Sequence, residues 1–215
     1  ENYTKVLAIS TSALPSPSNG YGGLENVLYD TCEGMAILGH EVTLITTNDS
    51  SKLGIHEAIG ADGKSTGGVL DVKTAGPGGW GIQFERDMYF NYKEFMENQF
   101  GEGQGLILSM NWFGYPYLSL GGWRNVQLPN GQIMDIPAHP KMKMIHVIHG
   151  TTGLGGQKIP STVKFPRLVG VSRPQAAFLG SQFGFPVRHV HNGIKIPPKP
   201  ETWPPHEDFY LSLNR

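Results

Sequence analysis

The chain has 215 residues, of which 39% are hydrophobic and 16% are charged, and its formal net charge is −1. This length allows one domain with a sizeable core, and the near-neutral charge gives no reason to expect nucleic acid or an anionic membrane as the main partner. The single cysteine, Cys32, cannot form an internal disulfide, which favours a reducing, cytoplasmic location.

Short apolar runs alternate with helical patterns along most of the chain. Lys5–Thr11 is a nearly continuous apolar run, as expected for a strand buried on both faces, and Leu24–Leu38 has apolar residues at helical spacing. By the same criteria we expect strands at 39–47, 68–74, 105–110, 143–149, 167–172 and 187–194 and helices at 84–100 and 173–184. This alternation predicts an α/β fold: a Rossmann-like, three-layer domain with a mostly parallel sheet and helices on both faces.

Two segments depart from this alternation. Residues 125–137 carry an Asn-Gly turn between flanks of alternating polarity, which predicts an inserted hairpin to which the sequence assigns no role. Residues 197–207 are rich in proline and are predicted to be a linker. We therefore expect residues 1–196 to form the main domain and residues 208–215 to be the first strand of a further domain, missing or truncated in this chain.

The segment Asn19–Glu25, "NGYGGLE", places three glycines just before the first expected helix. A dinucleotide fingerprint would need glycine at the position of Glu25 and a tight turn, whereas the approach from Ser12 is long, so bound NAD is not expected. Two interpretations remain open. Gly22 and Gly23 allow an anion to approach the helix N-terminus closely, or these glycines only satisfy turn geometry.

Several polar and aromatic residues follow the ends of expected strands. His149 ends the strand at 143–149 and is expected in the cleft beyond the carboxyl ends, whereas His146 is expected to pack within the sheet. Trp112 and Tyr115 follow another strand, and their rings suit sugar stacking or core packing. The histidines lack the paired ligand spacing of a metal site, and no G-x-S-x-G motif supports a hydrolase.

Ordered motifs across nearly the whole chain resemble the N-terminal domain of GT-B-fold, family 4-like glycosyltransferases. The motifs are "GGLE" (Gly22–Glu25), "LGHEVTLIT" (Leu38–Thr46), "VIHG" (Val147–Gly150), "LVGVSRPQAAFL" (Leu168–Leu179) and "VHNGIKI" (Val190–Ile196). The resemblance implies one half of a GT-B fold, which binds the acceptor in a retaining sugar transfer from a nucleotide-sugar donor. It also implies no metal and no cofactor, with the donor held mainly by a second domain, so that this chain alone would be inactive.

The resemblance also assigns roles to individual residues. Gly22 and Gly23 would lie under the donor diphosphate, and His149 would be the catalytic residue beside the transferred sugar. The further acceptor or cleft candidates are Glu25, Asn111, Trp112, Tyr115, Ser172, Asn192 and Gly193.

The expected partner is a sugar or glycoconjugate acceptor. Because relatives act on lipid-linked acceptors, peripheral membrane association stays open, although the sequence shows no basic amphipathic helix. The alternative function is a self-contained, Rossmann-like module that binds a ligand without catalysis.

Overall fold

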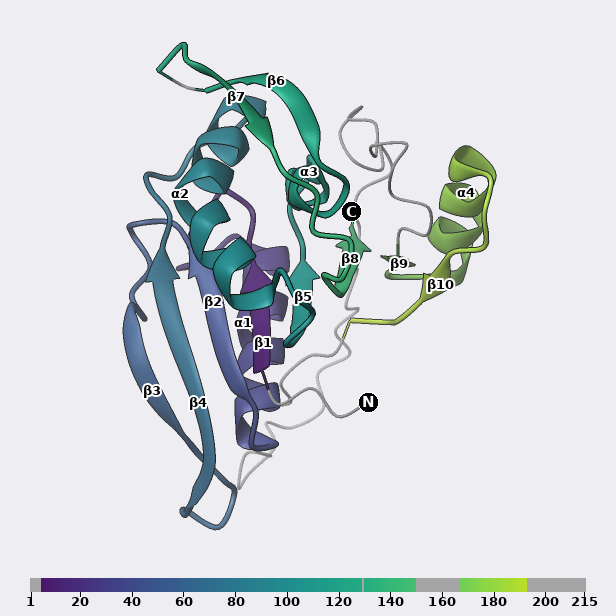
Figure 1. The fold of residues 1–215 in the computed structure, drawn as a ribbon. Coiled ribbons are helices and arrows are strands. Elements are labelled where there is room, and N and C mark those ends of the chain that lie inside the picture. The colour runs from purple at the N-terminus through teal and green to yellow at the C-terminus, as the bar shows by residue number, and fades with distance from the viewer. Residues whose placement is uncertain (1–4, 129, 150–166, 193–215) are drawn as a thin grey trace.

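A computed structural model describes residues 5–128, 130–149 and 167–192 (Figure 1). The strands are β1 (Lys5–Ile9), β2 (Glu41–Thr46), β3 (Gly54–Ile59), β4 (Ser65–Thr74), β5 (Leu106–Ser109), β6 (Trp123–Gln127), β7 (Ile133–Ile136), β8 (Met144–Ile148), β9 (Leu168–Gly170) and β10 (Arg188–His189). The helices are α1 (Gly23–Ile37), α2 (Ile82–Phe100), α3 (Pro116–Gly121) and α4 (Arg173–Phe183). Gly193, the predicted linker at 197–207 and the predicted strand at 208–215 lie outside the described residues.

Eight of the described strands form one sheet in the order β10-β9-β8-β5-β1-β2-β4-β3. Every neighbouring pair is parallel except β3 with β4, which is antiparallel at the edge. When the seven parallel strands are numbered along the chain, their order is 3-2-1-4-5-6-7. The predicted α/β fold with a mostly parallel sheet is therefore confirmed, and the strand order reverses direction between β1 and β5.

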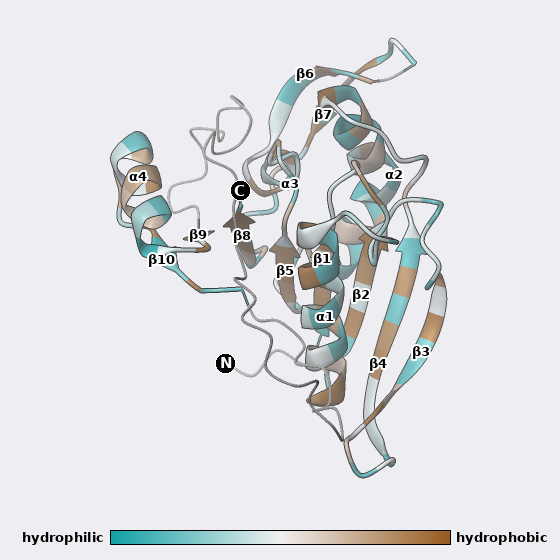
Figure 2. Cartoon of the chain, turned by 180° about the vertical axis from the view of Figure 1, so that it is seen from behind, coloured by the Kyte–Doolittle hydropathy of each residue, from teal (hydrophilic) through white to brown (hydrophobic). Residues whose placement is uncertain are grey.

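Strand β1 is covered on both faces. Val6 and Ala8 belong to the core that includes α1, whereas Leu7 and Ile9 belong to the core that includes α2. Figure 1 shows α2 in front of the sheet, and Figure 2, drawn from behind, shows α1 on the opposite face. Alternate side chains of one strand thus contact two helical layers, which explains the nearly continuous apolar run. Cys32 is fully buried in the α1 layer, where burial raises the pKa of its thiol.

The two ends of the sheet differ in polarity. In Figure 2, β5 and β8 are mainly hydrophobic, whereas β3 and β4 alternate between hydrophobic and hydrophilic residues. On β3, Ala58 is buried but Ile55 and Ile59 are 74% and 49% exposed. This strand is absent from the sequence prediction, because only one of its faces is buried and no continuous apolar run marks it.

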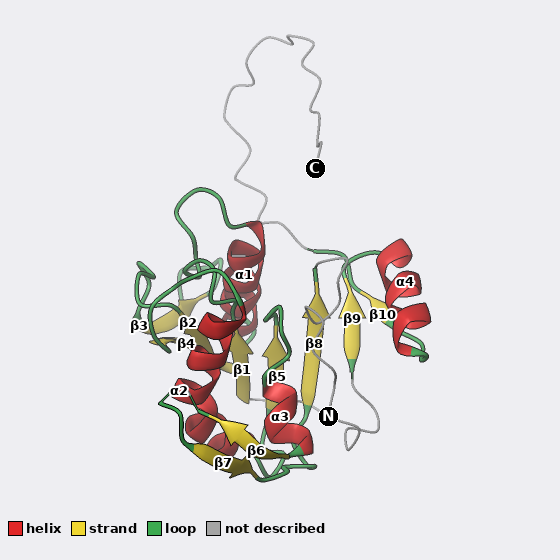
Figure 3. Ribbon diagram, turned by 90° about the horizontal axis from the view of Figure 1, so that it is seen from above, coloured by secondary structure: helices red, strands yellow, loops and turns green. Residues whose placement is uncertain are grey.

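The connection between the neighbouring strands β5 and β8 contains α3 and the hairpin β6–β7. The antiparallel pairing of β6 with β7 confirms the predicted hairpin, and Gly131 in its turn has a φ of 84°. Figure 3 shows the hairpin beside α2 and α3. Helix α3 was not predicted, since its six residues are too few to show helical periodicity. Within the described segments, no helix is both long and apolar enough to cross a bilayer.

Helix α1 packs closely on β4 at Gly68. A Cβ atom at this residue would lie 1.9 Å from the carbonyl oxygen of Ala36, whereas a Cβ at Gly34, within α1, would contact nothing within 4 Å. We expect Gly68→Ala to lower the free energy of unfolding by about 1–3 kcal/mol, because the helix must move away from the strand. Gly34→Ala is the control, and we expect it to stabilise by up to about 1 kcal/mol. Chemical denaturation of both variants measures the difference, and equal effects would contradict the packing.

Candidate functional site

The carboxyl ends of β1 and β5 lie side by side where the strand order reverses, which is where open α/β sheets bind ligands. The residues that follow β1 are polar and buried: Ser10, Thr11 and Ser12 are at most 2% exposed. Asn111 and Trp112 follow β5 at the same edge. Most of these side chains are not open to solvent, so the edge is built mainly from hydrogen bonds between loops.

Helix α1 begins at this edge without a side-chain cap. Its N-cap residue, Gly22, is buried and has a φ of 147°, and a Cβ atom there would lie 2.0 Å from Ser18 Oγ. The packing of the loop itself therefore requires glycine at this position. Gly23, the first helical residue, is exposed. Any ligand at this helix terminus would approach over Gly23 rather than Gly22.

Glu25 joins the loop that follows β1 to the first turn of α1. It is 4% exposed, and its Oε1 accepts a hydrogen bond of 2.5 Å from Thr11 Oγ1. Its backbone carbonyl accepts a second hydrogen bond of 2.5 Å from Ser16 Oγ. A carboxylate in the first turn is also favourable with the helix dipole. The side chain of Glu25 thus supports the loop and is not presented to solvent.

Glu85, in the first turn of α2, links the loops that follow β1 and β5. It is 1% exposed, and its two carboxyl oxygens accept hydrogen bonds from the backbone N–H groups of Trp112 and Phe113, each at 2.9 Å. The backbone N–H of Ser12 is a third donor. Burial raises the pKa of Glu85 to about 7, while these hydrogen bonds act to lower it. Glu85 therefore holds three segments together at the reversal point.

Glu85 was not among the candidates from the sequence, although a signal for its burial exists. It stands three, four and seven residues before Met88, Tyr89 and Tyr92, all of which are buried on one face of α2. An acidic residue on the apolar face of a helix must find hydrogen-bond partners inside the protein. The sequence does not reveal that these partners are backbone amides of distant loops.

Two tryptophans meet at the same edge. The ring centroids of Trp80 and Trp112 lie 5.1 Å apart at an interplanar angle of 46°. Trp80 is 57% exposed, and the loop that carries it is joined to Ser12 by a hydrogen bond of 2.7 Å from the backbone N–H of Gly79. Trp112 thus lies between a buried loop and an exposed ring, so this pair offers an aromatic surface to a ligand.

Asn111 and Tyr115 have internal partners instead. Asn111 donates a hydrogen bond of 2.9 Å from Nδ2 to the backbone oxygen of Ser10, and its Oδ1 accepts one of 2.7 Å from Ser109. Tyr115 is 7% exposed and stacks on Tyr89 with ring centroids 5.8 Å apart. Asn111 therefore joins β1 to β5, and Tyr115 lies in the core rather than on an open loop.

The two histidines of β8 differ in environment. His146 is fully buried beside the ring of Tyr117, and burial lowers the pKa of its imidazole to about 4. This confirms that His146 packs within the sheet. His149 follows β8 and is half-buried at the carboxyl edge, one strand away from the end of β5. It therefore shares an edge with Trp112 and the start of α1.

The remaining candidates lie at the far end of the sheet. Ser172 follows β9 and caps α4, because its side chain accepts a hydrogen bond from the backbone N–H of Gln175. Asn192 is exposed and follows β10, at the opposite end of the sheet from β3. Within the described part of the chain, no group of three or more His, Cys, Asp and Glu side chains is arranged to hold a metal ion.

No protein-family model matches the chain, and a search of curated proteins finds no match.

The buried carboxyl of Glu85 makes folding stability depend on pH. Its folded pKa, about 7, exceeds the ordinary value of 4.5, so the folded state binds the proton more tightly. Its contribution is fully present below pH 4.5 and is lost as the pH rises to 7. Between these values, we expect the unfolding free energy of the wild type to fall by about 3 kcal/mol relative to Glu85→Gln. Denaturation across this pH range checks the expectation, with exposed Glu57→Gln as the control; parallel curves for wild type and Glu85→Gln would contradict it.

Proposed function

We propose that this chain is the acceptor-side, Rossmann-like half of a GT-B-type retaining glycosyltransferase, which transfers a sugar from a nucleotide-sugar donor. The observation that carries the proposal is the shared edge of the sheet. The uncapped start of α1, which follows β1, and His149, which follows β8, lie on either side of the end of β5. The strand order, which reverses at this same edge, supports it as well.

The start of α1 suits the leaving group of such a reaction. Departure of a nucleoside diphosphate develops negative charge, which the amide groups and dipole of a helix N-terminus stabilise. Gly23 has no side chain to block the approach and is exposed. The carboxylate of Glu25 lies on the inner side, where its Oε2 would be 3.3 Å from a Cβ at Gly22. The diphosphate would therefore approach from the outer side, over Gly23.

The other residues of the edge would serve the sugars. His149 would donate a hydrogen bond to the transferred sugar and so help to place the reacting centre. The rings of Trp80 and Trp112 would stack on the sugar of the acceptor. The donor would be held mainly by a second domain, and domain closure would exclude water. As proposed, the reaction uses no cofactor, and the nucleotide sugar is a substrate.

A donor screen tests this function directly. The full-length protein is incubated with common nucleotide sugars, and release of nucleoside diphosphate is measured with and without candidate acceptors. We expect release with one donor class. If no donor is turned over while the protein still binds sugars, the alternative of a non-catalytic binding module is favoured.

Gly23 allows the diphosphate site to be tested without disturbing the loop. We expect Gly23→Val in the full-length protein to lower donor turnover by about 100-fold, because the added side chain blocks close approach to the helix N-terminus. The melting temperature should change little, since this residue is exposed. Gly22→Ala is the contrasting variant, in which we expect lost stability from the clash with Ser18. Turnover by Gly23→Val close to wild type would refute the diphosphate site.

The role of His149 separates catalysis from packing. We expect His149→Ala to lower kcat by about 100-fold or more, because a hydrogen bond to the reacting sugar is lost in the transition state. As the residue is only half-buried, thermal stability should fall little. His56→Ala, a change at a half-buried histidine of the edge strand β3, serves as the control for loss of an imidazole. Parallel losses of activity and melting temperature would instead indicate a packed histidine.

A further inference from the structure

A groove of about 770 Å³ runs along α2 beside the β6–β7 hairpin. Its wall is formed by residues of the β4–α2 loop, of α2 and of the hairpin. None of the residues assigned to the candidate site lines this groove. Its volume is in the range of pockets that bind small organic ligands.

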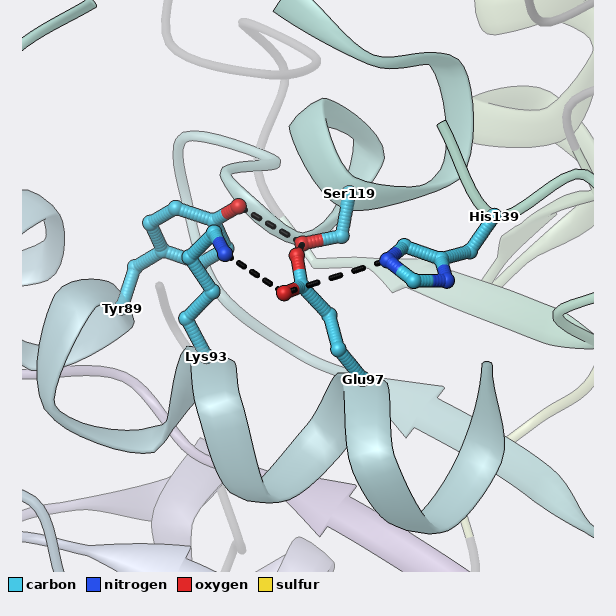
Figure 4. Close-up of polar contacts among 5 residues, drawn as sticks. All are labelled: Tyr89, Lys93, Glu97, Ser119 and His139. Carbon is cyan, nitrogen blue, oxygen red and sulfur yellow. Dashed lines mark hydrogen bonds and ion pairs between the residues drawn. The ribbon is translucent and has the colours of Figure 1, made fainter. Parts of the chain in front are cut away.

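The base of the hairpin meets α2 at the side chain of Glu97 (Figure 4). Ser119, which precedes β6, donates a hydrogen bond of 2.6 Å to Glu97 Oε1 and is 2.7 Å from the hydroxyl of Tyr89. His139, which follows β7, has its Nε2 3.8 Å from Glu97 Oε2. The backbone N–H of His139 also donates to the backbone oxygen of Ser119 at 2.8 Å. The start of the hairpin is thus bonded to Glu97 on α2, and the residue that follows the hairpin is bonded to Ser119 through its backbone.

The groove has a largely apolar surface. Phe84, Met88 and Phe90 contribute from α2, and Leu128 and Met134 face them from the hairpin. The Phe84 ring is fixed by the loop before α2, because a Cβ atom at Gly79 would lie 2.4 Å from its ring carbons. Such a surface favours an apolar ligand body, and the rings also attract a cation.

The hydrogen-bond donors among the groove's polar side chains are engaged within the protein, so mainly oxygen acceptors face a ligand. Lys93, the basic residue of the lining, is tied to Glu97 at 2.5 Å. Asn91 donates from Nδ2 to the backbone oxygen of Ala75 at 2.7 Å, which turns its Oδ1 away from that bond. Asn130 is engaged with Gln132 in its own turn, through both its amide nitrogen and its amide oxygen.

Asp87, Asn91 and Glu94 form a row of oxygen atoms along α2. They are spaced four and three residues apart, so they lie on one face of the helix. Asp87 shares one oxygen with Arg86 at 3.1 Å. Glu94 is exposed and has no ion pair within the described residues. The complement of this row is a group that carries only hydrogen-bond donors and a positive charge.

We propose that the groove between α2 and the hairpin binds a primary ammonium group carried on an apolar body. The ammonium lies along the row of Asp87, Asn91 and Glu94, and the apolar body lies on Phe84, Met88 and Met134. Of the three carboxylates that line the groove, Glu97 is paired with Lys93, so Asp87 and Glu94 supply the negative charge that complements the ammonium. This binding site does not depend on the proposed transferase activity.

Binding of n-octylammonium to the chain, measured by calorimetry and by amide chemical shifts in NMR, tests the proposal. We expect at least about fivefold tighter binding than for octan-1-ol, which has the same apolar body without charge. The quaternary analogue, with the charge but no N–H donors, should bind more weakly than the primary amine. Affinity should fall as salt is raised. The shifted amides should belong to α2 and the hairpin.

Variants then locate the ammonium. Glu94→Gln changes an exposed residue and should weaken n-octylammonium binding by about threefold to fivefold, while leaving octan-1-ol binding unchanged. Glu57→Gln, an equivalent change on β3, should have no effect. Equal affinity for the amine and the alcohol, tighter binding of octanoate, shifts elsewhere in the chain, or no response to Glu94→Gln would each overturn the proposal.

Discussion

The burial of β1 on both faces is the constraint on which the rest of this structure depends. A strand with no face open to water needs a helical layer on each side, and α1 and α2 supply these layers. Its neighbours β2 and β5 are both parallel to it, so the carboxyl ends of the three strands lie at one edge. Because crossovers are right-handed, helices on opposite faces require the connections through α1 and α2 to run in opposite directions along the sheet. The same constraint therefore places the start of α1 and the end of β5 at one edge.

Buried polar groups at this edge hold the loops together, as apolar packing holds the helical layers on the sheet. Glu85 accepts backbone hydrogen bonds from the loops after β1 and β5, and the side chain of Asn111 joins the same two segments by a further hydrogen bond. Burial carries a desolvation cost, seen in the raised pKa of Glu85, and the fixed hydrogen bonds offset part of that cost. The position of Trp112, and with it the aromatic surface beside the edge, therefore depends on the side chain of Glu85 in α2.

The sequence predicts the helices and strands that have a regular apolar pattern, but not the contacts between residues far apart in the chain. The runs around β1, β5 and β8 are apolar and α2 has aromatic residues at helical spacing, so these elements were found to within a few residues. For Tyr115 the sequence left sugar stacking and core packing open, because it does not show that α3 begins there and that Tyr89 stacks on its ring. The donors to Glu85 are backbone amides, which every residue but proline has, so no side-chain pattern announces them.

The antiparallel edge strand has a consequence for how copies of this protein meet. Among the described strands, β3 is an end strand with one neighbour, and it carries two exposed isoleucines; such an edge is a template for edge-to-edge association. The register that brings Ile55 opposite Ile59 of a second copy also places the two Glu57 carboxylates directly opposite each other. Like charges so placed repel. One acidic residue within a short strand thus acts against aggregation through the β3 end of the sheet.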